Sequence, residues 1–219
     1  AAVSCVSEFK QPGCVVIKHA NPCGAAVSDN VYDSFLKALN ADRLSAFGGI
    51  VALNRECTTE IAKELSDFFI EIIVAPSFTK ESLEIFSSKK NLRVIELVSL
   101  DGFNDKTSVR NINGGLLLQE TDTFTVDAKS LKIVTDSKIS PNTYGTIEFG
   151  WTVLKYIKSN GILIVKNNAT LGVGAGQVSR VDSVDIAITK ASGDIKDSIL
   201  LSDAFFPFRD SIDTVSYTH

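Results

Sequence analysis

Short apolar runs alternate with helical segments through the first hundred residues, and this alternation constrains the fold more than any other feature. Runs rich in β-branched residues are typical of buried strands, and they occur at residues 14–18, 50–53, 70–75 and 92–97. The segments 31–41, 58–68 and 80–87, which lie between these runs, are predicted helices, the first capped from Ser28-Asp29-Asn30. We therefore expect α/β layers around a mostly parallel sheet in this part of the chain.

Two segments of the chain do not follow this alternation. Residues 19–24 (HANPCG) are expected to form a loop because of their Pro and Gly content. Residues 100–141 are irregular, and only the short runs LLL and LKIVT are predicted strands there. We interpret this second segment as a connection between two domains.

The last third of the chain is predicted to contain a helix, a hairpin and a further helix. The helix covers residues 146–159, and the strands ILIV and ATLGVG flank Asn167-Asn168, a pair that tolerates the positive φ of a tight turn. Ser179 or Ser183 can cap the next helix. The predicted organisation is a first domain at 1–100, an irregular connection at 101–145 and a second domain at 146–219.

Composition excludes several classes of function. The chain has 219 residues and a net charge of −4, so its surface as a whole does not attract nucleic acid or anionic membranes. No apolar run is long enough to span a bilayer, and the first residues lack the pattern of a signal peptide. The four cysteines form no C-x-x-C pair, which predicts reduced thiols in the cytoplasm rather than a zinc site.

Lys18-His19 is the sharpest candidate for chemistry. Histidine exchanges protons near neutral pH, and an adjacent ammonium favours the neutral imidazole that acts as a base. Neighbouring side chains of a strand point to opposite faces, so both reach one site only if the chain leaves β geometry here. The alternative is a surface lysine beside a hydrogen-bonded histidine. A zinc site formed by His19 and Cys23 is disfavoured because two ligands do not complete one.

Glycines at 172, 174 and 176 resemble part of a dinucleotide fingerprint, but they follow the second strand of a hairpin, which disfavours that site. Glycines nevertheless let the backbone approach a ligand closely. Arg180 follows them at a helix N-terminus and is a candidate clamp for a phosphate or carboxylate. An exposed arginine in a first helical turn is the alternative.

Three further segments carry candidate binding residues. Phe47, followed by paired glycines, can stack on a planar ligand or belong to the core and a turn. Glu71 opens a buried strand and can bind a ring amine or face water. Residues 205–210 (FFPFRD) are typical of hydrophobic core or an oligomer interface.

Taken together, these segments resemble the AICAR transformylase domain of the bifunctional purine biosynthesis protein, in its bacterial type. The other half of that protein is IMP cyclohydrolase, and because the matching segments include none of it, we expect no cyclohydrolase activity from these residues. The matching segments occur in the family's order and cover most of the chain: KHANPCGAA (18–26), RLSAFGGIVALNRE (43–56), EIIVAPSF (71–78), NGGLLLQ (113–119), KSNGI (158–162), GVGAGQVSRVDS (172–183) and SDAFFPFRDSID (202–213).

The resemblance implies transfer of a formyl group from 10-formyltetrahydrofolate to the 5-amino group of AICAR. It implies three catalytic residues: His19 as general base, Lys18 as the cation that stabilises developing charge, and Asn160 as the asparagine that orients the reacting groups. The residues that it implies for AICAR are Phe47, Gly48, Glu71, Gln177, Ser179 and Arg180. Those that it implies for folate are Phe205, Pro207 and Ser211, although some relatives have Asn at the last position.

The resemblance also implies an architecture and an assembly. The fold is an α/β fold of two cytidine deaminase-like subdomains, each with three layers and a mixed sheet, and the protein is a cytoplasmic homodimer with shared active sites. A structural potassium ion is implied near Asp203. Relatives continue beyond residue 213 with a further loop and strand, so the second subdomain is expected to be incomplete at its C-terminal end.

Two other functions stay open at this point. The chain can be a nucleotide-binding fragment without catalytic activity, in which case AICAR binds without turnover. It can also be a dinucleotide-dependent oxidoreductase, in which case NADH binds at the turn of residues 172–176.

Overall fold

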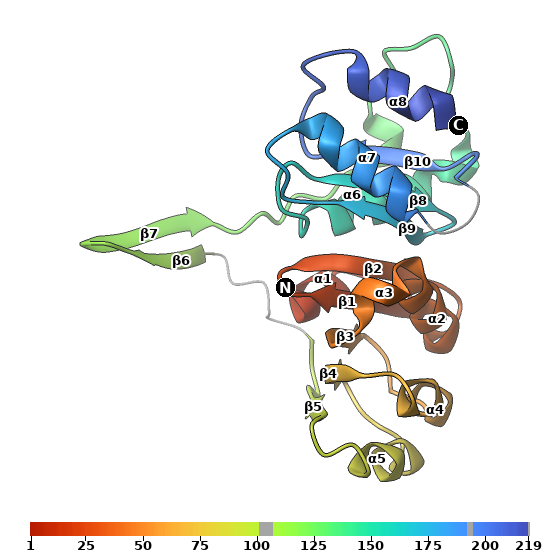
Figure 1. Ribbon diagram of the computed structural model, residues 1–219, viewed down its shortest axis with the longest axis vertical. Coiled ribbons are helices and arrows are strands. Elements are labelled where there is room, and N and C mark those ends of the chain that lie inside the picture. Colours follow the sequence, from red (N-terminus) through yellow and green to blue (C-terminus); the bar gives the residue numbers. More distant parts are fainter. Residues whose placement is uncertain (101–106, 192–194, 219) are drawn as a thin grey trace.

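Eight strands form one sheet within residues 1–100, 107–191 and 195–218, the residues that this computed structural model describes. They are β1 (Gly13–Lys18), β2 (Asn21–Val27), β3 (Gly49–Leu53), β4 (Ile70–Ala75), β5 (Arg93–Glu96), β8 (Ile162–Lys166), β9 (Ala169–Gly174) and β10 (Ile199–Ser202). Their order across the sheet is β10-β8-β9-β2-β1-β3-β4-β5 (Figure 1). Strands from both ends of the chain therefore share one sheet, which is continuous where β2 lies beside β9.

The sheet is mixed, as the resemblance implied, so the mostly parallel sheet that we expected for the first hundred residues is wrong. Only β3, β4 and β5 run parallel, and the other neighbouring strands pair antiparallel. Residues 19–24, expected to form a loop, contain a two-residue connection followed by the start of β2. Such a short connection can join only antiparallel strands, and this fixes the direction of β2.

Of the other predicted elements, a strand and a hairpin agree with the structure and one strand does not. The strand at 70–75 and the hairpin around Asn167 and Asn168 are confirmed, and both asparagines have positive φ, 50° and 57°. The predicted strand LKIVT at 131–135 is absent. An apolar run becomes a strand only where another strand supplies backbone partners, and no strand among the described residues pairs with this run.

Helices cover both faces of the sheet and complete three layers (Figure 1). One face carries α1 (Ala2–Ser7) and α6 (Tyr144–Leu154). The other carries α2 (Val31–Ala41), α3 (Arg43–Ala46), α4 (Thr59–Ser66), α5 (Lys80–Ser87) and α7 (Arg180–Lys190), and α8 (Asp210–Thr218) packs on α7. Two 3₁₀ turns, Ala128–Ser130 and Pro141–Thr143, precede α6. None of the helices within the described residues has the length and apolar character needed to cross a membrane.

The two faces of β1 explain its unbroken apolar sequence. Cys14 and Val16 belong to the apolar cluster on the side of α2, α4 and α5, whereas Val15 and Ile17 belong to the cluster on the side of α1 and α6. All four side chains are buried, at no more than 1% exposure. A strand covered on both faces loses the alternation of polar and apolar residues, as β1 does.

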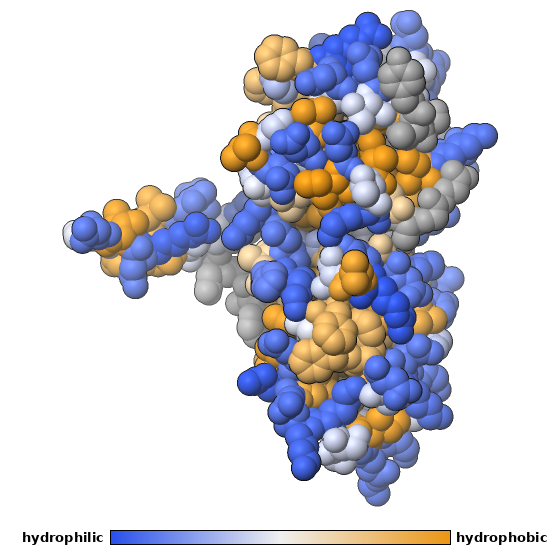
Figure 2. All heavy atoms as spheres, viewed as in Figure 1, coloured by the Kyte–Doolittle hydropathy of each residue, from blue (hydrophilic) through white to orange (hydrophobic). Residues whose placement is uncertain are grey.

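A separate hairpin of β6 (Thr107–Ile112) and β7 (Gly115–Glu120) extends away from the body of the molecule as an arm (Figures 1 and 2). All of its residues are exposed. The register places Val109, Leu116 and Leu118 on one face, and Ile112 and Leu117 on the other. The arm lies within the expected connection, whose residues 101–106 are outside the described residues. A lone hairpin with apolar side chains on both faces is marginal by itself, so this arm is a candidate contact surface.

Glycines of β9 bring that strand against α7. A Cβ atom built on Gly174 would lie 1.8 Å from the carbonyl oxygen of Ser183, and one on Gly172 would lie 2.0 Å from that of Ala187. Our expectation that these glycines make room for a ligand is therefore wrong, because a helix occupies the space. The dinucleotide alternative loses its basis for the same reason. Gly176 differs, since it has φ +72° and nothing lies within 4 Å of its built Cβ.

This contact predicts a large loss of stability for Gly174→Ala. The added methyl group cannot be accommodated without moving β9 from α7, so the free energy of unfolding should fall by about 3 kcal/mol. Gly115→Ala is the matched control, because its Cβ would meet its nearest neighbour only at 4.0 Å. Urea unfolding of both variants measures the difference, and equal stabilities would contradict the proposed packing.

Candidate active site

The turn between β1 and β2 brings Lys18 and His19 to one place. His19 has φ 54°, a left-handed conformation that few side chains adopt, so the chain does leave strand geometry at this residue. Both side chains line one cavity of about 340 Å³, which we call the His19 cavity. The sequence required the chain to leave β geometry here if both side chains were to reach one site, and this is confirmed. His19 is exposed, so its imidazole is accessible to a ligand.

Two backbone carbonyl groups hold the ammonium of Lys18. Its Nζ donates to the oxygen of Phe47 at 2.8 Å and to that of Gly48 at 2.9 Å. Gly48 has φ +66°, and a Cβ atom there would come within 2.9 Å of the same Nζ. Position 48 therefore needs glycine for both its conformation and the space that Lys18 occupies.

The side chains of Phe47 and Glu71 were also predicted to bind a ligand. The ring of Phe47 is 58% exposed and packs against Phe68 and Phe69, with centroids 6.1 and 5.3 Å away. Glu71 is exposed on β4, near the point where β4 pairs with Gly49. Ligand binding by either residue stays a prediction.

The opposite wall of the His19 cavity contains an ion pair that joins the two halves of the chain. Lys190 of α7 donates to Asp42 at 2.9 Å and to Ser45 at 2.9 Å, and Ser45 donates to Asp42 at 2.6 Å. Burial raises the pKa of Asp42, but hydrogen bonds from Ser45 and Lys190 outweigh it and hold the pKa below its ordinary value of 3.8. Sequence reasoning missed Asp42 and Lys190, because only the fold brings them together.

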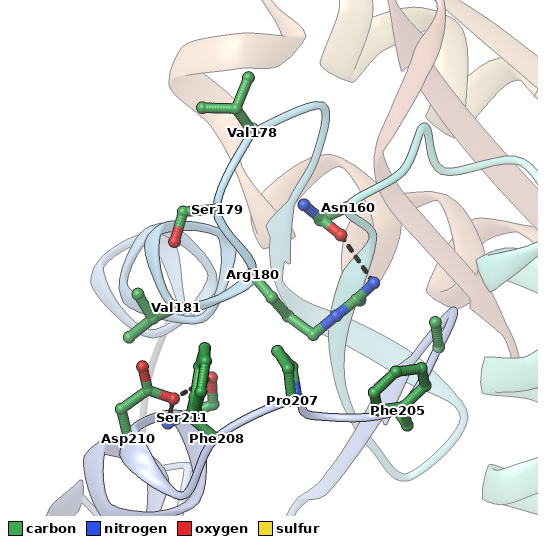
Figure 3. Close-up of a pocket in the computed structure, with 11 residues that line it drawn as sticks. Asn160, Val178, Ser179, Arg180, Val181, Phe205, Pro207, Phe208, Asp210 and Ser211 are labelled. Carbon is green, nitrogen blue, oxygen red and sulfur yellow. Dashed lines mark hydrogen bonds between the residues drawn. The ribbon is translucent and has the colours of Figure 1, made fainter.

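Asn160 has hydrogen bonds at both ends of its amide. Its backbone N–H and its Nδ2 donate to the carbonyl oxygen of Gln177 at 3.3 and 2.9 Å. Its Oδ1 accepts from Nη2 of Arg180 at 2.6 Å, the dashed contact in Figure 3. Gln177 also lines the His19 cavity, so Asn160 is bound to a residue that shares this cavity with Lys18 and His19.

The guanidinium of Arg180 donates hydrogen bonds to other side chains of the protein. Its Nη1 donates to Ser202 at 2.9 Å and to Asp203 at 2.5 Å, and its side chain is only 9% exposed. Burial raises the pKa of Asp203, but hydrogen bonds from Ser159, Arg180 and the backbone of Gly161 outweigh it and lower the pKa. Substrate binding by Arg180 stays a prediction.

The carboxylate of Asp203 accepts a hydrogen bond from Arg180 in this structure. The potassium ion implied near Asp203 stays a prediction, and we assign no chemistry to it.

A second cavity of about 360 Å³, which we call the Arg180 cavity, collects the residues implied for folate (Figure 3). Phe205, Pro207 and Ser211 line it together with Asn160, Ser179 and Arg180. Phe205 is 81% exposed, whereas Ser211 is buried and its backbone N–H donates to Asp210 at 2.6 Å. Phe208 and Asp210 also line this cavity and belong to the FFPFRD segment, but they were not among the residues implied for folate.

The ion pair between Asp42 and Lys190 predicts a pH-dependent contribution to stability. Because folding lowers the pKa of Asp42, its contribution is present above the unfolded pKa and is lost as pH falls through the folded pKa. Asp42→Asn should therefore destabilise the protein at neutral pH, and the difference from the parent should shrink below about pH 4. Denaturant unfolding across pH measures this. Asp185→Asn, an exposed carboxylate on α7, is the control, and a pH-independent difference for Asp42→Asn would contradict the assignment.

Comparison with known proteins identifies the family of this chain. The family model described as AICARFT/IMPCHase bienzyme matches residues 1–190. The bifunctional purine biosynthesis protein PurH of Thermoanaerobacter sp. (strain X514) is 44% identical over 213 residues, 97% of this chain and 42% of that protein. PurH of Anoxybacillus flavithermus (strain DSM 21510 / WK1) is 44% identical over 216 residues, 99% of this chain and 42% of that protein.

One solved structure gives a more distant match. The apo dCMP deaminase of the cyanophage S-TIM5 covers 43% of this chain and 90% of its own, at 9% identity and a TM-score of 0.35, too low to support an argument. The chain spans less than half the length of the PurH relatives that it matches. The extent of the family match and the identity to PurH settle the family: the chain belongs to the AICARFT/IMPCHase bienzyme family.

Proposed function

We propose that this chain transfers a formyl group from 10-formyltetrahydrofolate to the 5-amino group of AICAR, giving formyl-AICAR and tetrahydrofolate in purine biosynthesis. The observation that carries the proposal is the position of Gln177, which lines the same cavity as Lys18 and His19 and accepts a hydrogen bond from Asn160. Membership of the AICARFT/IMPCHase family supports it. The free thiols of all four cysteines agree with a cytoplasmic location, which is part of the proposal.

His19 is the proposed general base. The 5-amino group of AICAR is a weak nucleophile, because its lone pair is delocalised into the imidazole ring and the carboxamide. Attack on the formyl carbon therefore needs removal of a proton from this nitrogen, and a neutral imidazole nitrogen can accept it. The tetrahedral intermediate then collapses: the bond between the formyl carbon and N10 of the folate breaks, N10 takes a proton from the imidazolium or from solvent, and tetrahydrofolate leaves. His19 is exposed and can exchange its proton with solvent.

Lys18 and Asn160 are the proposed donors to the tetrahedral oxyanion. An ammonium has three N–H donors, and the carbonyl groups of Phe47 and Gly48 take two of those of Lys18. The amide nitrogen of Asn160 has two N–H donors, and the carbonyl oxygen of Gln177 takes one. Each residue thus keeps one N–H for a ligand, and such a donor contributes about 3 kcal/mol to transition-state stabilisation.

Folate is the proposed ligand of the Arg180 cavity, and AICAR that of the His19 cavity. Phe205, Pro207 and Phe208 offer apolar walls to a flat heteroaromatic ring, and Asp210 offers a carboxylate to its N–H groups. Of the residues that the resemblance implies for AICAR, Gln177 lines the His19 cavity, whereas Ser179 and Arg180 line the Arg180 cavity. Phe47 and Gly48 are placed beside the His19 cavity through their carbonyl groups, which hold Lys18, and Glu71 stays a proposed AICAR residue on the resemblance alone. Because Asn160 lines the folate cavity and contacts Gln177 of the other, it lies where formyl donor and acceptor would meet.

Substitution of His19 tests the base. His19→Ala and His19→Gln should each lower kcat by about 100-fold, because neither side chain accepts a proton near neutral pH. Formyl transfer is followed by absorbance, and AICAR affinity by calorimetry should change little in either variant. Retained turnover in the Gln variant would show that His19 only donates a hydrogen bond. AICAR binding by a parent chain without turnover would favour the binding-fragment alternative.

We further propose that two copies of the chain form a homodimer with shared active sites, and that the β6–β7 arm takes part in the contact. The exposed fractions of Val109, Leu116 and Leu118 are 55%, 66% and 69%, which leaves one face of the arm apolar (Figure 2). Ile112 and Leu117 are exposed at 56% and 49% on the other face. Burial of such a hairpin against a second copy would remove this apolar surface from water.

A shared site predicts that activity per chain falls on dilution. Activity and sedimentation should change over the same concentration range, because a dissociated chain lacks part of its site. Leu118→Lys places a charge in the proposed contact, so the loss of activity and the change in sedimentation should both occur at a higher protein concentration. Ser108→Lys adds the same charge at an exposed position of the arm and should leave them in place. Constant specific activity across dissociation would indicate a complete site in each chain.

A further inference from the structure

Arg180 connects three segments that meet at the edge of the Arg180 cavity. It begins α7, its Nη2 reaches Asn160 just before β8, and its Nη1 reaches Ser202 and Asp203 at the end of β10. Figure 3 shows the side chain of Arg180 extended toward Asn160. These bonds, between 2.5 and 2.9 Å, use both terminal nitrogens of the guanidinium on protein acceptors.

The charge of Arg180 is already compensated inside the protein. Asp203 lies 2.5 Å from its Nη1, and the two side chains are only 9% and 22% exposed. A guanidinium with its own carboxylate is less available to a substrate anion than a free one. The hydrogen bond from Arg180 to Asn160, in contrast, is already formed in this structure.

The bonds of Asn160 fix the direction of its amide. Its Oδ1 faces the donors of Arg180, while its Nδ2 faces the carbonyl oxygen of Gln177. A flipped amide would set NH₂ against the guanidinium and oxygen against the carbonyl group, and both bonds would be lost. Its backbone carbonyl oxygen also accepts from Ser183 at 2.8 Å. Arg180 therefore determines where the second N–H of Nδ2 points.

We propose that Asp203 is a positioning residue for formyl transfer: it holds the guanidinium of Arg180, which fixes the amide of Asn160 toward the reacting groups. This inference rests on the proposed function, because it assigns a task to Asn160 in that reaction. Removal of the carboxylate of Asp203 frees Arg180 to move, and small displacements of a group that contacts the transition state are costly.

Asp203→Asn in the full-length protein tests the proposal. We expect kcat to fall about tenfold while KM for AICAR and for the folate changes by less than about twofold, because orientation rather than binding is lost. Asp213→Asn is the matched control, since it removes the exposed ion pair with Arg209 and should leave both constants unchanged. Asp203→Glu, which keeps the charge, should recover part of kcat.

A double-mutant cycle separates positioning from a general structural effect. If Asp203 acts through Asn160, Asp203→Asn should cause little further loss of kcat in an Asn160→Ala background. Additive losses would overturn the proposal. So would a raised KM for AICAR with kcat preserved, which would assign Arg180 to substrate binding, or a loss that KCl but not NaCl restores, which would assign Asp203 to a cation.

A measurement without turnover keeps this test separate from the proposed function. Absence of formyl transfer in the parent protein would remove the proposed function, but the side-chain amide signals of Asn160 in NMR still report its orientation. They should shift in Asp203→Asn and stay in place in Asp213→Asn. Unchanged signals in Asp203→Asn would overturn the positioning of Asn160 whatever the activity of the parent.

Discussion

The pairing of β2 with β9 is the contact on which the candidate site depends. Ala26 lies opposite Ala169, the backbone N–H of Ala25 donates to Thr170 Oγ1 at 2.9 Å, and that of Val27 donates to the carbonyl oxygen of Asn168 at 3.0 Å. A few bonds thus make two sets of strands into one sheet. Because β2 follows directly on His19, and β9 leads directly to Gln177, the same junction sets the two catalytic candidates of the first half beside the second half.

The polar groups around this junction are held in advance of any ligand. Carbonyl groups of a turn hold Lys18, a carboxylate holds Arg180, and Arg180 in turn holds Asn160. Asn21 adds a contact between the halves, because its Oδ1 accepts from the backbone N–H of Lys158 at 2.9 Å. Groups fixed in this way need little reorganisation when charge develops, which is the condition for electrostatic stabilisation of a transition state.

The sequence predicted the local elements better than their arrangement. The apolar runs of β3 and β4, the Asn30 cap of α2 and the positive φ of Asn167 and Asn168 depend on neighbours in the chain, and the structure agrees with them. The mixed direction of the sheet and the missing strand at 131–135 depend on which segments of the chain pair with one another. No local pattern in the sequence specifies that pairing. The glycines of β9 show the same limit, because only the position of α7 reveals what they make room for.

The sequence by itself determined the family, the α/β alternation and the residue types available for chemistry. Each of these depends on the order of neighbouring residues within short segments of the chain. Tertiary structure decided that Lys18 rests on the carbonyl groups of Phe47 and Gly48, that Asp42 pairs with Lys190, and that Arg180 is bound to Asp203 and Asn160. The partners in these contacts are separated by about 20 to 150 residues in the chain. Such pairs meet only when the sheet and its helices have formed, so no spacing in the sequence could specify them.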